Sequence, residues 1–169
     1  MEQSSCEATV EIIQTYPDLA RELVKMISSA QREIYIAPRF YEPAIGSRMI
    51  SKVAEGVSIH MLDANPSAVA FEKRLRAAGT HDLKTRELIS KFLDQPNSVV
   101  QVKRLDYSFL VVDGHSCGIE IVNPTNPDDF FWAIKLESAS LAKELITIFH
   151  SLANTGETPM QNEGPRAES

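Results

Sequence analysis

Runs of apolar residues alternate with amphipathic stretches along the first half of the chain. Two runs, 33–38 and 57–63, are almost continuously apolar, which is typical of strands covered on both faces of a parallel sheet. The segments before and between them carry apolar residues three or four positions apart, which indicates amphipathic helices. We expect the first helix to be capped by Thr15 and the second to run from Pro43 to Gly56.

The second half of the chain is dominated by short β-prone runs. Segments 108–112 and 117–122 flank Asp113-Gly114, a dipeptide that favours a tight type I′ hairpin turn. The expected strands are 9–14, 33–38, 57–63, 98–105, 108–112, 117–122 and 130–136, and the expected helices are 15–30, 43–56, 67–78, 82–94 and 138–153.

This order predicts an α/β domain with helices on both faces of one sheet. We expect the sheet to be mixed and mostly parallel, with antiparallel strands in the C-terminal half. The domain should cover residues 8–153. Residues 1–7 and 154–169 are polar or rich in Gly and Pro, so we expect a disordered N-terminus and a disordered tail.

Charge and composition narrow the possible functions. The formal net charge of −6 argues against a nucleic-acid-binding surface, because phosphate contacts need clustered Lys and Arg. We find no apolar run long enough to cross a bilayer and no signal peptide, so we expect a cytoplasmic protein without membrane contact. The two cysteines, Cys6 and Cys117, allow one disulfide at most and suggest no zinc site; we expect no cofactor.

Three segments carry a resemblance to a known family. They are the helix end Ile27-Ser-Ser-Ala30, the strand E-I-Y-I-A-P at 33–38 and the strand G-V-S-I-H-M-L at 56–62. Together with the order of elements over residues 8–153, they resemble the single-motif half of the phospholipase D superfamily.

The family's catalytic motif, H-x-K-x-x-x-x-D followed by G-S-x-N, is largely missing. Asp113 fits the last position of the first part, but Asp106 stands at the His position and Ser108 at the Lys position. In the second part, Glu120-Ile-Val-Asn123, only Asn123 fits. The resemblance implies a histidine that attacks phosphorus and a lysine that neutralises phosphate charge. Because Asp and Ser do neither, we expect a pseudoenzyme without catalytic residues.

Versions of this fold without the motif serve as effector domains of archaeal TrmB-like transcriptional regulators, where they bind sugars or other small molecules. This chain is similar to such a domain taken alone. The resemblance therefore implies a ligand-binding sensor or effector domain linked to transcriptional regulation. We find no helix-turn-helix before residue 30, so this chain is not expected to bind DNA directly. Single-motif units commonly pair across a two-fold axis, and we expect a homodimer.

A ligand site is expected at the carboxyl ends of the parallel strands, where ligands gather in open α/β sheets. Each residue alone is also explained by loop solvation or helix capping, so the prediction concerns the group. Its members are Arg39, Tyr41, Asp63, Asn65, Asp106, Ser108 and Asn123.

Several alternatives remain open. Asp63, Asp106 and Asp113 suggest a metal-assisted hydrolase or phosphodiesterase, and the chain is alternatively a structural dimerisation module. Asp113 itself is better explained by the hairpin turn than by a relic catalytic role. The spacing of Asp113, His115 and Cys117 allows a weak metal hypothesis.

Two aromatic features favour packing roles. His60 lies inside an apolar strand and is expected to be a hydrogen-bonded core or interface histidine rather than a ligand. Trp132, with Phe130 and Phe131, is expected in the core or on a dimer surface rather than on a stacking platform for a ligand.

Overall fold

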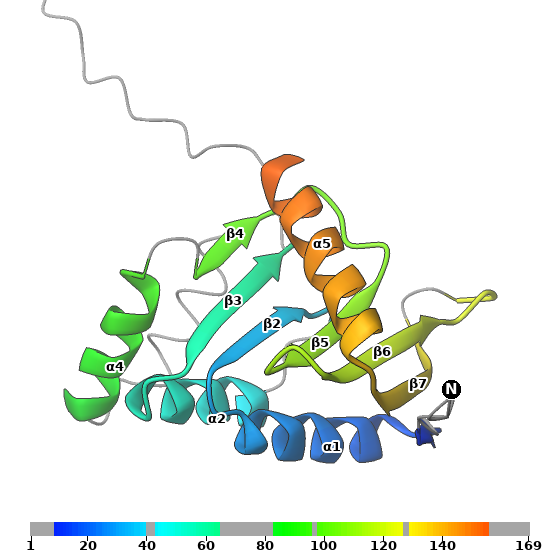
Figure 1. Ribbon diagram of the computed structural model, residues 1–169, viewed down its shortest axis with the longest axis horizontal. Helices are drawn as coiled ribbons and strands as arrows, with labels where there is room; N and C mark the ends of the chain where they lie inside the picture. The colour runs from blue at the N-terminus through cyan, green and yellow to red at the C-terminus, as the bar shows by residue number, and fades with distance from the viewer. Residues whose placement is uncertain (1–8, 40–42, 65–82, 96–97, 127–128, 156–169) are drawn as a thin grey trace, which may run out of the picture.

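A computed structural model describes residues 9–39, 43–64, 83–95, 98–126 and 129–155 (Figure 1). The expected helix 67–78 and the expected disordered N-terminus lie outside these residues, as does the expected tail beyond Thr155. The elements are β1 (Val10–Ile13), α1 (Tyr16–Ser29), β2 (Glu33–Ala37), α2 (Pro43–Ala54), β3 (Ser58–Asp63), α4 (Leu83–Leu93), β4 (Val99–Gln101), β5 (Ser108–Val112), β6 (Ser116–Val122), β7 (Phe130–Glu137) and α5 (Ala139–Thr155).

The seven strands form one mixed sheet in the order β1-β7-β6-β5-β2-β3-β4. The pairs β2–β3 and β3–β4 are parallel, whereas β1–β7, β7–β6, β6–β5 and β5–β2 are antiparallel. The expectation of a mostly parallel sheet is therefore wrong, although the α/β class is confirmed. The difference arises because β1 pairs with β7 at the far edge of the sheet, and because the β5–β6–β7 meander joins β2 in antiparallel register.

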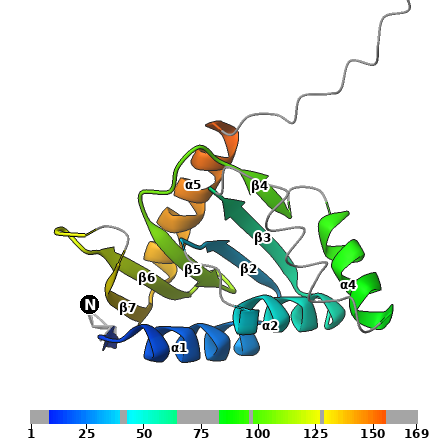
Figure 2. The same cartoon turned by 180° about the vertical axis from the view of Figure 1, so that it is seen from behind.

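Helices cover both faces of this sheet (Figure 1, and from behind in Figure 2). One face of β2, β3 and β5 packs against α1, α2 and α4 through side chains such as Ile34, Ile59 and Leu110. The other face packs against α5, where Tyr35, Val111 and Phe149 belong to a second apolar cluster. Alternate residues of the central strands thus enter different clusters, as the two-residue period of a strand requires.

Local signals at the helix ends behave as the sequence predicts. Thr15 caps α1, since its Oγ1 accepts a hydrogen bond of 3.3 Å from the backbone N–H of Asp18. Gly56, with φ of 89°, follows α2 in the left-handed conformation that favours glycine. One contact was not predicted: Lys52 of α2 is buried, and its Nζ donates a hydrogen bond of 3.0 Å to the carbonyl of Ala30, which connects the end of α1 to α2.

The β5–β6 hairpin turns at Asp113 and Gly114, whose φ values of 52° and 73° agree with the predicted turn. The Asp113 carboxylate also accepts hydrogen bonds from the backbone N–H groups of Gln31, Arg32 and Glu33, at 2.8, 2.8 and 3.0 Å. Burial alone would raise the pKa of Asp113, but these amides and the Arg32 guanidinium outweigh it and lower the pKa. The structural interpretation of Asp113 is confirmed.

Replacing Asp113 tests this connection. We expect Asp113→Ala to lower the free energy of unfolding by about 2–3 kcal/mol, because three backbone amides lose their acceptor. Asp113→Asn should cost less, about 1 kcal/mol, since asparagine keeps one oxygen and tolerates positive φ. Urea unfolding at neutral pH measures both.

We also expect the difference in stability between wild type and Asp113→Asn to depend on pH. The folded pKa of Asp113 lies below 3.8, so its stabilising effect is present above that pH and is lost as the pH falls through the folded pKa. Wild type and Asp113→Asn should therefore become equally stable in strong acid. A constant difference at every pH would contradict the role of the charge.

Candidate functional site

A buried carboxylate lies at the edge of the sheet where β2 ends. Glu120 of β6 is opposite Ser108 of β5 in the strand register, and its side chain is 3% exposed. Its Oε1 accepts a hydrogen bond of 3.4 Å from Nη1 of Arg39, which follows β2 and is itself mostly buried. The Ser108 hydroxyl also hydrogen-bonds Glu120. We call Arg39, Ser108 and Glu120 the strand-end cluster.

The electrostatics of the strand-end cluster are set by burial. Burial raises the pKa of Glu120, while the guanidinium of Arg39 and the hydroxyl of Ser108 act in the opposite direction without cancelling it. Loss of solvation disfavours the charged form of a carboxylate, and a nearby cation and a hydrogen-bond donor favour it. Glu120 therefore depends on Arg39 for its charged form.

A second buried carboxylate, Asp63, ends the neighbouring strand β3. It is 8% exposed, and its Oδ2 accepts a hydrogen bond of 3.1 Å from Nε2 of Gln101 in β4. Because β2 and β3 are parallel and paired, their carboxyl ends lie at the same edge of the sheet. Asp63 and the strand-end cluster thus occupy the edge where the sequence predicts a ligand site.

The structure brings only part of the predicted site together. Asp106 is exposed and forms an ion pair of 2.5 Å with Arg104, another exposed residue. Asn123 organises a turn, since its Oδ1 accepts hydrogen bonds from the backbone of Thr125 and Asn126. Neither contact involves Glu120. The partners of Asp106 and Asn123 in these contacts are local, so these two side chains stabilise their own loops. Tyr41 and Asn65 lie outside the described residues.

The metal hypotheses find no geometric support. Asp113 lies at the start of β2, whereas Asp63 lies at the end of the parallel strand β3, so they stand at opposite edges of the sheet. The Asp113 carboxylate is engaged by backbone amides, and Cys117 is fully buried, with its pKa raised to about 11 by burial and then by Glu137. Within the described ranges, no three His, Cys, Asp or Glu side chains are grouped to hold a metal ion.

The predictions for His60 and Trp132 have different outcomes. His60 stacks on Tyr35 with ring centroids 4.6 Å apart and also approaches Phe149 of α5, so it packs among aromatic rings. Burial lowers the pKa of His60, opposed by Glu33 and assisted by His150. In contrast, Trp132 is 42% exposed, so its expected place in the core is wrong, and a surface role remains.

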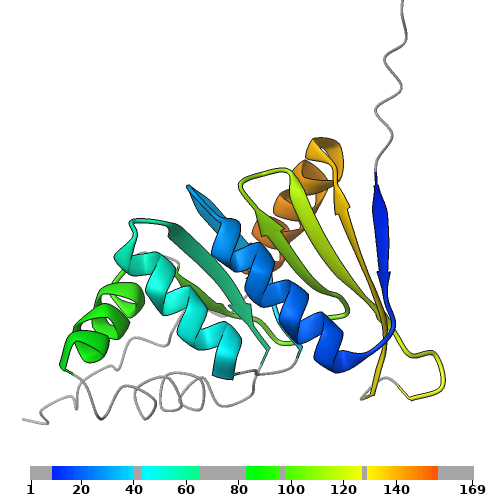
Figure 3. The ribbon, with the colours of Figure 1, turned by 90° about the horizontal axis from the view of Figure 1, so that it is seen from below.

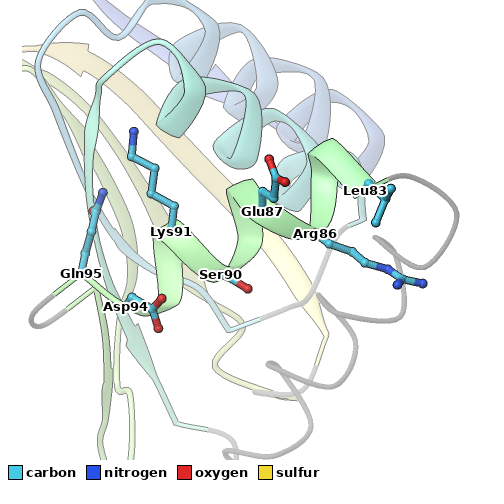
Figure 4. Close-up of a pocket in the computed structure, with 7 residues that line it drawn as sticks. All are labelled: Leu83, Arg86, Glu87, Ser90, Lys91, Asp94 and Gln95. Carbon is cyan, nitrogen blue, oxygen red and sulfur yellow. The ribbon is translucent and has the colours of Figure 1, made fainter.

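A shallow pocket of about 690 Å³ lies elsewhere, along α4 (Figure 4). Its lining carries charges of both signs, among them Arg86, Glu87, Lys91 and Asp94. Of the predicted site residues that the structure describes, none lines this pocket. This pocket therefore offers no support for the predicted ligand site.

Glu120 is the site residue that sequence reasoning missed. Its signal is an acidic residue between two isoleucines in an otherwise apolar strand. The local sequence pattern is equally compatible with a glutamate that faces solvent. The pairing of β5 with β6, which sets Glu120 opposite Ser108, is what brings it beside Arg39.

Comparisons with known proteins show which solved structures share this fold. No protein-family model and no curated protein matches the chain. Among solved structures, NucT from Helicobacter pylori has a TM-score of 0.63 at 15% identity, covering 89% of this chain and 98% of that one. Nuc from Salmonella typhimurium, a phospholipase D family member, has a TM-score of 0.59 at 13% identity, covering 89% and 97%. The chain has a phospholipase D-like fold.

A third match is TrmBL2, an archaeal chromatin protein, with a TM-score of 0.66 at 14% identity. The match covers 92% of this chain but 55% of TrmBL2, so this chain corresponds to about half of that protein. The predicted resemblance to the phospholipase D-like fold and to TrmB-like proteins is confirmed at the level of fold. Among the described helices, none combines the length and apolarity needed to span a membrane.

Removing the cation beside Glu120 tests the electrostatics of the strand-end cluster. We expect Arg39→Met to lower the free energy of unfolding by about 3 kcal/mol at neutral pH, because it leaves a buried carboxylate without its cation. A carboxyl with a raised pKa stabilises the fold below its unfolded value of 4.5, and this contribution is lost as the pH rises. The cost of Arg39→Met should therefore shrink below that pH.

Arg21→Met is a matched control, since Arg21 pairs with Asp18 and both side chains are exposed. It should cost less than about 1 kcal/mol. Equal losses for Arg21→Met and Arg39→Met in denaturant titrations would contradict a buried, charge-dependent cluster.

Proposed function

We propose that this chain is a non-catalytic, ligand-binding regulatory domain built on the phospholipase D-like fold. The observation that carries the proposal is Glu120. A buried carboxylate hydrogen-bonded to Ser108 lies beside the position that the resemblance assigns to a phosphate-neutralising lysine. Negative charge there opposes phosphate binding, and serine supplies neither a cation nor the attacking imidazole.

The chemistry of the strand ends favours an uncharged or cationic ligand. Glu120 and Asp63 offer carboxylate oxygens as acceptors, and Arg39 offers guanidinium donors. A small molecule with several hydroxyl or amino groups satisfies both kinds of partner, and buried polar groups that bind such groups reject analogues lacking them. A phosphate ester adds repulsion from the carboxylates.

A link to transcription is part of the proposal. TrmBL2, which shares the fold, is described as a chromatin protein with a novel mode of DNA binding. The net charge of −6 disfavours direct contact of this chain with nucleic acid. We propose that this cytoplasmic domain passes ligand occupancy to a DNA-binding module on the same protein or on a partner.

Calorimetry against a compound panel tests the proposal. Neutral sugars and polyols, small amines, and phosphate esters form its three arms, and a fluorogenic phosphodiester measures turnover. We expect saturable binding from the neutral or amine arm, none from the phosphate arm, and no phosphodiester cleavage. Glu120→Gln should weaken that binding at least about tenfold, because a charge-assisted hydrogen bond is lost.

Glu144→Gln is the matched control, since Glu144 is exposed on α5. It should bind as wild type does, and thermal unfolding of both variants shows whether the fold is intact. Phosphodiester turnover by the purified chain, or binding confined to the phosphate esters, would overturn the proposal.

A further inference from the structure

Helix α5 lies on the face of the sheet opposite α1 and α2, and four rings meet beneath its C-terminal half (Figure 3). They belong to Tyr35 of β2, His60 of β3, and Phe149 and His150 of α5. Tyr35 and His60 are direct partners in the parallel register, and their rings stack with planes 18° apart. Phe149 meets both rings edge-on, at centroid distances of 5.2 and 6.5 Å, and His150 meets Tyr35 at 5.7 Å. We call these four residues the ring cluster.

The two halves of α5 are attached to the sheet in different ways. At the N-terminal end, the backbone N–H of Ser138 donates a hydrogen bond of 2.7 Å to the carbonyl of His115. The Ser138 hydroxyl accepts one of 3.2 Å from the N–H of Leu141, which fixes the first turn. The C-terminal half is held through the ring cluster and through apolar side chains such as Leu152. Because hydrogen bonds fix the first end and ring packing the second, the C-terminal half is the part that can separate from the sheet by itself.

The surroundings of His60 offer a proton little compensation. Among the described residues, the ionisable groups that face His60 are Glu33 and Tyr35 from β2 and His150 from α5. The strand on the other side of β3 is β4, whose residues Val99–Gln101 are uncharged. The carboxylate of Glu33 already accepts a hydrogen bond from the Tyr35 hydroxyl. A positive charge on His150 would repel one on His60, so the single acid must offset both burial and this repulsion.

We infer that the ring cluster is a proton-operated latch: protonation of His60 loosens the C-terminal half of α5 from the sheet while the rest of the domain stays folded. A charged imidazole needs solvation, and the packed rings displace much of the water around it. Separation of α5 gives His60 access to water and moves His150 away from it. The latch therefore couples proton uptake to exposure of the apolar surface under α5.

Proton linkage gives the direction of the pH dependence. Burial lowers the pKa of His60 from its usual 6.5, while Glu33 opposes this effect and His150 adds to it. When α5 separates, the pKa returns toward 6.5, so the open form binds more protons than the closed form. The attachment of α5 is therefore strongest above pH 6.5 and weakens as the pH falls toward the pKa of the closed form. One pH unit below 6.5, a single proton can raise the opening constant by at most about tenfold.

Hydrogen exchange of the full chain without ligand, at about pH 7.5 and about pH 5.5, measures the opening. Protection is corrected for the pH dependence of intrinsic exchange. Residues 146–155 of α5 should be less protected than the hairpin strands β5 and β6 at both pH values, because they open without the rest of the domain. Their protection should fall at least about twofold at the lower pH.

Variants of His60 separate the proton from the packing. His60→Phe keeps a ring against Tyr35 but takes up no proton, so protection of residues 146–155 should be the same at both pH values. His60→Gln removes ring and proton together and should lower protection equally at both, which keeps the test valid if phenylalanine packs poorly. His115→Gln is the matched control, since His115 is exposed on the hairpin beside Glu137. It should behave as wild type does.

Titration of the imidazole resonances by proton NMR is the second measurement. We expect the pKa of His60 to lie below 6.5 and to rise in His150→Gln, because that substitution removes the repulsion. A pKa at or above 6.5, a loss of protection at low pH that persists in both His60 variants, or equal protection of α5 and the hairpin would overturn the inference. None of these results bears on ligand binding at the strand-end cluster, so failure of the latch is distinct from failure of the proposed function.

Discussion

The antiparallel pairing of β5 with β2 determines which residues meet at each end of these two central strands. At one edge it brings Asp113, at the end of β5, to the first backbone amides of β2. At the other it places Ser108, at the start of β5, beside the end of β2 and beside Glu120 in the next strand. The same strand therefore carries a carboxylate that stabilises the fold and a hydroxyl that belongs to the candidate site. Its register connects the parallel strands to the meander.

The two carboxylates differ because their partners differ. Asp113 accepts three backbone N–H groups, so its charged form is stabilised although the group is partly buried. Glu120 is buried more deeply and relies on a side-chain cation at 3.4 Å and one hydroxyl. Burial raises the free energy of a charge unless hydrogen bonds and opposite charges compensate. Of the two, Glu120 is the one whose charge state a ligand entering the strand-end cluster would change most.

The sequence predicted those features that are encoded within a few residues. The Thr15 cap, the Asp113-Gly114 turn and the buried runs of β2 and β3 depend on local chemistry, and the structure agrees with each of them. The position of β1 was not predictable in this way, because the choice between β2 and β7 as its partner depends on contacts across the whole sheet. The exposure of Val10 and Ile12 follows from the same placement.

The candidate site was only partly predictable, for a related reason. Arg39 and Asp63 follow directly from the rule that ligands gather at strand ends, since each ends or follows a parallel strand. Glu120 depends on strand register, and Asp106 and Asn123 were included because of motif spacing, which does not show where a side chain points. Of the predicted group, the structure thus keeps Arg39 and Ser108 in a small buried cluster centred on Glu120, with Asp63 at the end of the neighbouring strand.

Titration of the Glu120 side chain by carbon-13 NMR tests this centre most directly. We expect a carboxyl resonance that titrates with a pKa above 4.5 in the native protein and that shifts further upward in Arg39→Met. A pKa at or below 4.5, unchanged by Arg39→Met, would contradict a buried carboxylate held by Arg39.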